Sequence, residues 1–290
     1  MDGHQEDIPL QDLAGRNQNQ CEANRDENSE SPNLLEIYFS RYVRALVPEV
    51  PHPAERAEYN PHVYFMFLYS MGQLALFIAD EVTKDESYST SSGVIAKVLQ
   101  YDPQYRSQFW RYFTYIFVHS GYLHIIVNLI FQLGFGIPLE EVHGYNRVTN
   151  IYYYGNLAGS LAHGIIDSNA ILSGSSGGVY ALMTAHLAQV FLNLGDLPTS
   201  MTCIQLLIIS LLVFPDLGLS AYQKYYLQQI TEERVTCQLA GVCVGFLYGI
   251  YAIRDANISQ TEKYIGEVAG VVFFLLMVTG IVLNILHVTV

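Results

Sequence analysis

Charged residues are scarce in this chain, and basic ones most of all. Asp, Glu, Lys and Arg make up 14% of its 290 residues, whereas 51% are hydrophobic. Soluble domains usually carry about 25% charged residues, so this composition excludes an ordinary soluble domain. Only 14 residues are Lys or Arg, and the formal net charge is −13. Because a basic patch is missing, we expect no nucleic-acid partner.

Cysteine clusters of the metal-binding kind are also missing. The four cysteines are Cys21, Cys203, Cys237 and Cys243, and they show no metal-ligand spacing. Three of them fall in apolar runs, where free cysteine usually acts as a small buried side chain. We therefore expect no metal site and no cofactor, and we expect these three cysteines to be packed inside the protein.

Long apolar runs are what the chain has in abundance. Seven of them approach the ~17–25 residues that an α-helix needs to cross the hydrocarbon core of a bilayer. They cover residues 63–79, 122–139, 148–166, 174–194, 202–220, 235–253 and 266–288. This pattern predicts an all-α, polytopic transmembrane helical bundle of about seven spans.

The remaining segments divide the chain around these runs. Residues 1–60 are polar with few large apolar groups, which predicts a largely disordered N-terminal region in the cytosol. Residues 61–253 hold six of the runs and predict a six-helix core with a long outer loop at 81–109. Residues 254–290 predict a linker and an additional C-terminal transmembrane helix.

The distribution of arginine predicts the orientation in the membrane. Five arginines precede the first run, which favours a cytosolic N-terminus and places the start of the fourth run near the outer face. The glycosylation pattern Asn257-Ile-Ser259 would then lie in a cytosolic loop, so a sugar on Asn257 would contradict this topology. We expect a multi-pass integral membrane protein of the secretory pathway or plasma membrane, in contact with the lipid bilayer.

A glycine-flanked serine opens the fourth run. Residues 174–178 read Gly-Ser-Ser-Gly-Gly, which matches the Gly-x-Ser-x-Gly spacing of a nucleophile elbow around Ser176. Taken alone, this pattern in an apolar helix is more typical of close helix packing. Glycines at 241, 245 and 249 form a matching stripe in the sixth run. Small residues at that spacing let helix backbones approach, so we expect the fourth and sixth helices to pack together.

A second polar group lies at the start of the second run. His124 and Asn128 are four residues apart and therefore project from one face of a helix. Polar side chains inside a membrane usually face a cavity or the bundle interior. An imidazole and an amide on one face can donate hydrogen bonds to a developing oxyanion, although they can also simply join helices. Together with Ser176, the pair favours a catalytic arrangement.

These elements together resemble the rhomboid family of intramembrane serine proteases, in the animal secretase-type branch with six plus one spans. The resemblance extends from about Trp110 to Ile253. It implies a nucleophile at Ser176 and oxyanion donors at His124 and Asn128. It also assigns Trp110 and Arg111 to the outer loop, His119 to the His-x4-His-x3-Asn pattern, and Tyr180 to the aromatic that packs on the catalytic histidine.

The chain departs from that family at the general base. The family pattern Ala-His-Leu-Ala-Gly reads Cys-Gln-Leu-Ala-Gly here, so Gln238 stands in place of the histidine. A carboxamide does not take up a proton near neutral pH, whereas imidazole titrates around pH 6.5. No histidine occurs between His186 and His287, and His186 lies about 15 Å along the helix from Ser176. His124 is the nearest other candidate for a base, but it would have to leave its oxyanion role.

Three functions compete on this evidence. The first is a catalytically inactive pseudoprotease that binds the transmembrane segments of client proteins, because Gln238 replaces the base. The second is an active intramembrane serine endopeptidase that cleaves single-span membrane proteins, which the retained elbow at Ser176 favours. The third, a channel or transporter, lacks the two related halves with broken helices expected of such proteins.

Overall fold

The described residues of this protein form helices almost throughout. A computed structural model describes residues 65–84, 93–167, 170–192, 199–226, 235–253 and 260–288. The predicted N-terminal region and Asn257 lie outside these ranges. The long helices are α3 (Phe65–Val82), α6 (Tyr122–His143), α7 (Tyr145–Ile166), α8 (Ser176–Leu192), α9 (Thr199–Tyr225), α10 (Val235–Ala252) and α11 (Gln260–Val288). Each coincides with one of the seven apolar runs, so the prediction of an all-α bundle is confirmed.

The helices differ in how apolar they are. Among the described residues, α3, α6, α10 and α11 are long and apolar enough to cross a membrane by themselves. By contrast, α7 carries buried Asn156, Ser160 and His163, and α8 has only 17 residues. Helix α8 buries most of its residues, and α7 buries half of them. Protein replaces lipid around them, so they tolerate polar side chains that a lipid-facing helix would not.

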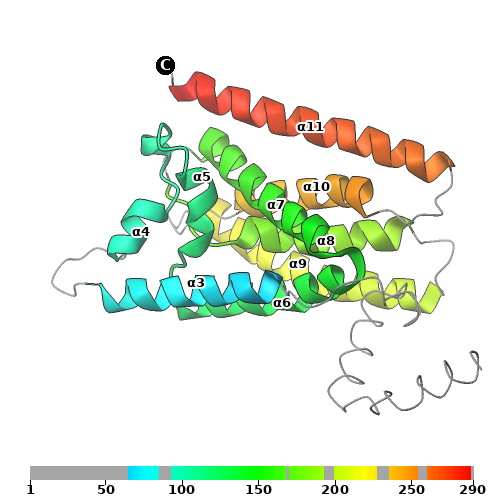
Figure 1. Ribbon diagram of the computed structural model, residues 1–290, viewed down its shortest axis with the longest axis horizontal. Coiled ribbons are helices and arrows are strands. Elements are labelled where there is room, and N and C mark those ends of the chain that lie inside the picture. The colour runs from blue at the N-terminus through cyan, green and yellow to red at the C-terminus, as the bar shows by residue number, and fades with distance from the viewer. Residues whose placement is uncertain are drawn as a thin grey trace, which may run out of the picture. The chain divides into compact units, whose positions relative to one another are not determined.

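Helix α8 lies at the centre of the bundle, packed by α6, α7 and α10 (Figure 1). Small residues permit that packing. A Cβ added to Gly241 of α10 would stand 2.2 Å from the carbonyl oxygen of Gly177, and one added to Gly245 would stand 2.3 Å from that of Ala181. The two backbones therefore touch along the glycine stripe, and the predicted contact between the fourth and sixth helices is confirmed.

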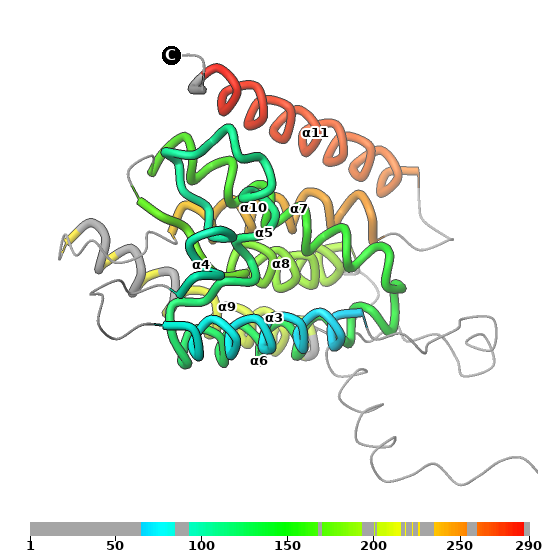
Figure 2. The backbone as a smooth tube through the Cα atoms, turned by 60° about the vertical axis from the view of Figure 1, so that its left-hand side comes forward, coloured from blue at the N-terminus to red at the C-terminus, as the bar shows by residue number. Residues whose placement is uncertain are grey.

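Between α3 and α6 the chain forms the outer segment, residues 94–117, seen in Figure 2 beside the ends of the long helices. It contains α4 (Val94–Leu99), η2 (Pro103–Tyr105), α5 (Arg111–Thr114) and η3 (Tyr115–Phe117). The predicted outer loop 81–109 thus contains structure of its own, although α3 continues into it as far as Val82.

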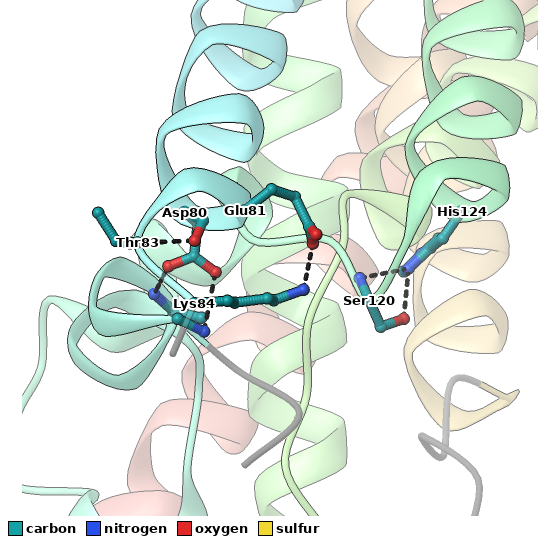
Figure 3. A network of polar contacts seen from close by, with 8 residues as sticks. Asp80, Glu81, Thr83, Lys84, Ser120 and His124 are labelled. Atoms are coloured by element: carbon teal, nitrogen blue, oxygen red, sulfur yellow. Dashed lines mark hydrogen bonds and ion pairs between the residues drawn. The ribbon is translucent and has the colours of Figure 1, made fainter. Parts of the chain in front are cut away.

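Two charged side chains hold this segment together. Asp80, at the end of α3, accepts hydrogen bonds from the backbone N–H groups of Gly93 (3.2 Å) and Ala96 (2.9 Å) at the start of α4 (Figure 3). Arg111 donates from Nη1 to the carbonyl oxygens of Lys97 (3.0 Å) and Gln100 (2.7 Å). The Trp-Arg pair therefore lies in the outer segment, and its arginine fastens the end of α4.

Helix α11 packs against α7 and α10 on the far side of the bundle from α3 (Figure 1). Most of its large apolar residues face outward, but Asn284 is buried. Its amide donates to the carbonyl of Leu161 in α7 (2.9 Å) and accepts from the hydroxyl of Tyr112 in α5 (3.2 Å). One amide therefore joins α11 to both α7 and the outer segment.

Candidate functional site

Ser176 is the first residue of α8, and the backbone before it bends sharply. Gly174 has φ +93°, in the left-handed region that favours glycine. A Cβ at this position would stand 2.4 Å from Cε1 of the His124 ring. Glycine therefore allows the turn and also lets the imidazole lie against the backbone. The Gly174 N–H donates to the carbonyl of Tyr115 (3.3 Å), which fixes the turn to the outer segment.

A cavity of about 320 Å³ opens beside Ser176. The four residues singled out from the sequence, His124, Asn128, Ser176 and Gln238, all line it. The rest of the lining comes from α6, α8, α9 and the turn before α6: Ser120, Leu123, Val127, Phe131, Val179, Tyr180, Met183 and Leu212. The structure thus brings together side chains from α6, α8 and α10 that lie up to 114 positions apart. Their catalytic roles stay predictions.

The hydrogen bonds of His124 define which of its nitrogens carries the proton. Its Nδ1 lies 3.3 Å from the backbone nitrogen of Ser120 and 2.9 Å from the Ser120 hydroxyl (Figure 3). A backbone N–H can only donate, so Nδ1 accepts, and we assign the proton of the neutral ring to Nε2. That nitrogen lies next to Gly174. His124 therefore presents a donor beside the turn that leads to Ser176, as an oxyanion role requires.

With this assignment we expect His124 to be a poor substitute base. A base needs a free lone pair directed at the serine hydroxyl. In His124 the lone pair of Nδ1 is directed at Ser120, while Nε2 carries the hydrogen. The sequence pattern did not point to Ser120, whose only signal is its place four residues before the histidine.

Asn128 links α6 to the elbow. Its Nδ2 donates to the carbonyl of His124 (2.9 Å), and its Oδ1 lies 3.5 Å from the hydroxyl of Ser175. Asn156 of α7 supports the other side of the elbow, because its Oδ1 accepts from the N–H of Gly178 (2.8 Å). Ser175 and Asn156 are further positioning residues that sequence reasoning missed.

The hydroxyl of Ser176 is buried and makes no hydrogen bond within the described residues. It therefore makes no hydrogen bond to Gln238. Gln238 is buried as well and lines the same cavity. The nucleophile position therefore lies beside a carboxamide without being bonded to it.

Three other histidines of the described bundle have different surroundings. His186 packs beside Phe135, with ring centroids 6.1 Å apart. His163 contacts the carbonyl of Ala170 through Nε2 (2.8 Å). The ring of His119 lies 5.1 Å from that of His124, but His119 does not line the cavity. Among the residues that line the cavity, His124 supplies the only imidazole.

The cysteine prediction was correct for one residue and wrong for two. Cys237 is fully buried, whereas Cys203 and Cys243 are exposed on the helix surfaces. The physical reason is the solvent: an exposed thiol on a membrane helix faces hydrocarbon rather than water, so burial gives it little advantage.

Comparisons with known proteins show what the chain is similar to. The family model of the Rhomboid domain matches residues 106–255. Rhomboid-related protein 2 of Mus musculus is 33% identical over 251 residues, which cover 82% of each chain. Rhomboid-related protein 3 of Homo sapiens is 32% identical over 200 residues, or 67% of this chain and 50% of that protein. Inactive rhomboid-related protein 2 of Caenorhabditis elegans is 29% identical over 201 residues, or 69% of this chain and 57% of that protein.

Proposed function

The chain belongs to the rhomboid family, and we propose that it is a catalytically inactive member, a pseudoprotease that binds the transmembrane segments of client proteins without cleaving them. It is a multi-pass integral membrane protein, as its apolar helices and its relatives indicate. Our proposal covers three further points: that the protein binds client helices, that it does not cleave them, and which membrane it occupies.

The observation that carries the proposal is Gln238 in the cavity beside Ser176. A serine hydroxyl becomes a useful nucleophile only when a neighbouring group takes its proton. Loss of the base in a serine protease lowers kcat by a factor on the order of 10⁶. We expect no compensation by His124, because the hydrogen of its neutral ring is assigned to Nε2 and Nδ1 accepts from Ser120. One relative is itself named inactive, in Caenorhabditis elegans, so the family includes members of this kind.

What remains in the cavity suits binding rather than chemistry. The Nε2–H of His124 and the amide of Gln238 are hydrogen-bonding groups in a buried site otherwise lined mainly by apolar side chains. Hydrogen bonds to such groups fix orientation, and apolar contacts supply most of the affinity. A helix is about 10 Å across, so a cavity of about 320 Å³ takes one or two side chains and not a whole helix. A client helix would therefore dock from the lipid and insert a side chain.

We also propose a cellular location and an orientation. The protein lies in a membrane of the secretory pathway or in the plasma membrane, with its N-terminus in the cytosol and its site near the outer face. The excess of arginine before the first helix supports that orientation.

The test is cleavage of a single-span rhomboid substrate in proteoliposomes that contain the purified protein. We expect no product, no labelling of Ser176 by a fluorophosphonate probe, and capture of the substrate by crosslinking from the cavity. The Ser176→Ala variant serves as the control and should capture the substrate equally well. Product formed by the unaltered chain and lost in Ser176→Ala would overturn the proposal.

One observation favours the second function, an active intramembrane serine endopeptidase. The whole elbow is intact, with Ser176 buried at the cavity and a donor from His124 beside it. The same experiment distinguishes the two functions, because only the endopeptidase gives a product that depends on Ser176.

A further inference from the structure

We propose that His163 and Asp167 are positioning residues that share one proton. Through this pair they fix the position of the turn before Ser176 relative to the start of α10. His163 lies in the last turn of α7 and is fully buried, and Asp167 follows that helix and is nearly so. Neither residue lines the cavity. They act on it through the segments to which they are bonded.

His163 holds the segment that leads to the elbow. Its Nε2 lies 2.8 Å from the carbonyl oxygen of Ala170. A carbonyl can only accept, so Nε2 carries a hydrogen. Farther along the same segment, Leu172 exchanges two backbone hydrogen bonds with Tyr101 (2.9 and 3.1 Å). Together with the bond from Gly174 to Tyr115, these contacts fix residues 170–174, which lead to the elbow.

Asp167 holds the start of α10. Its Oδ2 accepts a hydrogen bond from the hydroxyl of Thr236, a buried residue in the first turn of that helix. Thr236 lies two positions before Gln238. The backbone N–H of Asp167 also donates to the carbonyl of His163 (2.8 Å), which fixes the carboxylate relative to α7. The two residues therefore connect the segment that carries Ser176 with the helix that carries Gln238.

The pair requires a proton between its members. The Nδ1 of His163 lies 3.7 Å from Oδ2 of Asp167. Because Nε2 already carries the hydrogen, a neutral ring would direct the lone pair of Nδ1 toward the carboxylate, and two acceptors would face each other. One more proton, on the ring or on the carboxyl group, makes this contact attractive. In a buried setting, paired charges are strongly preferred over a lone carboxylate.

Tyr101 and Arg106 are the titratable groups of the outer segment that lie near this pair. Burial raises the pKa of Tyr101, whose ring centroid lies 6.1 Å from that of His163, so its hydroxyl stays neutral. The guanidinium of Arg106 donates to the carbonyl of Gly164, next to His163 in sequence. The groups that α10 and α11 bring to this end, Thr236 and Asn284, carry no charge.

Loss of the shared proton at alkaline pH should therefore loosen the link between the two segments. Hydrogen–deuterium exchange of the peptide containing residues 235–240 measures this directly in the full-length protein, after correction for the intrinsic exchange rate. Between about pH 5 and pH 9, the range around imidazole titration, we expect corrected exchange to rise with pH. In Asp167→Asn that rise should become much smaller, because the amide can donate an N–H to Nδ1 of His163, and the neutral ring then needs no further proton.

Removal of the Thr236 hydroxyl tests the link itself. Thr236→Val should raise corrected exchange of residues 235–240 about tenfold, the usual effect of losing a hydrogen bond to a charged group, and Thr236→Ser should restore it. Thr184→Val is the matched control, because the hydroxyl of Thr184 is equally buried but bonds within its own helix to Tyr180 (2.8 Å). Equal exchange in the two valine variants would refute the link. A flat pH profile in the unaltered chain would refute the shared proton.

The exchange measurements require neither a client protein nor cleavage activity. Failure of the proposed pseudoprotease function would leave the exchange results unchanged, and failure of the link would leave client capture to be judged separately.

Discussion

The two sides of the cavity differ in which of the predicted catalytic groups they retain. On the nucleophile side, formed by α6 and α8, the donor of His124 and the elbow at Ser176 are assembled and supported by Ser120 and Asn128. On the base side, formed by α10, the glycine stripe that packs the helix against α8 is present, and Gln238 lines the cavity at the position where the family resemblance predicts a histidine base. We therefore expect packing and reactivity to be separable: the proposal predicts that one side chain decides the chemistry while the packing stays the same.

The largest expected effect on cleavage comes from placing a histidine at position 238, where the family resemblance predicts the base. Gln238→His should raise the rate of substrate cleavage by roughly 10³-fold or more, because a missing base accounts for factors up to about 10⁶. Cleavage in proteoliposomes measures this, and the double variant Gln238→His with Ser176→Ala controls for contaminating proteases. No gain in a folded protein would mean that the nucleophile side is also incompetent, and the contrast between the two sides would fail.

The second-largest effect on activity is expected when the predicted oxyanion donor is removed from the Gln238→His variant. His124→Ala should lower kcat by about 10²–10³-fold with little change in KM, since a preorganised donor acts mainly in the transition state. Steady-state kinetics in detergent micelles separate the two constants. If KM rose and kcat were unchanged, His124 would be a binding group instead.

The third effect concerns packing on the base side. Gly241→Ala should lower the free energy of unfolding by about 1–3 kcal/mol, because the new Cβ would overlap the carbonyl of Gly177. Gly72→Ala is the matched control, since no atom lies within 4 Å of a Cβ at that position in α3. Thermal unfolding in the same detergent compares the two. Equal melting temperatures would contradict the close contact of α8 and α10.

The smallest effect concerns the orientation of the donor. Ser120→Ala removes the hydroxyl that lies 2.9 Å from Nδ1 of His124 but leaves the backbone N–H. Activity of the Gln238→His background should therefore fall by about tenfold or less. A fall as large as that of His124→Ala would mean that the hydroxyl, and not the backbone, sets the tautomer.

Much of this arrangement was predictable from local patterns. The apolar runs predicted every long helix, and the four-residue spacing of His124 and Asn128 predicted their shared face. The glycine stripe predicted which helix α8 would touch. These features repeat at the period of a helix, so a single stretch of sequence contains them.

Links between distant segments were not predictable in this way. The bonds from Asp167 to Thr236 and from Asn284 to Leu161 each join residues whose separation in sequence follows no period. The exposure of Cys203 and Cys243 likewise depends on which helix face meets lipid. Such pairings follow from the placement of whole helices, and a lone Asn or Asp in the sequence does not reveal its partner.

Asn284 has a consequence for biosynthesis. Helices enter the membrane in chain order, so α11 arrives after the helices that it will contact. Until then the hydroxyl of Tyr112 lacks the acceptor that Asn284 provides, and the carbonyl of Leu161 lacks the donor. Asn284 itself is an amide in a largely apolar helix. Each of these groups is costly in hydrocarbon. An unfinished molecule thus exposes polar atoms that the finished one hides, a difference that quality-control machinery in the membrane could detect.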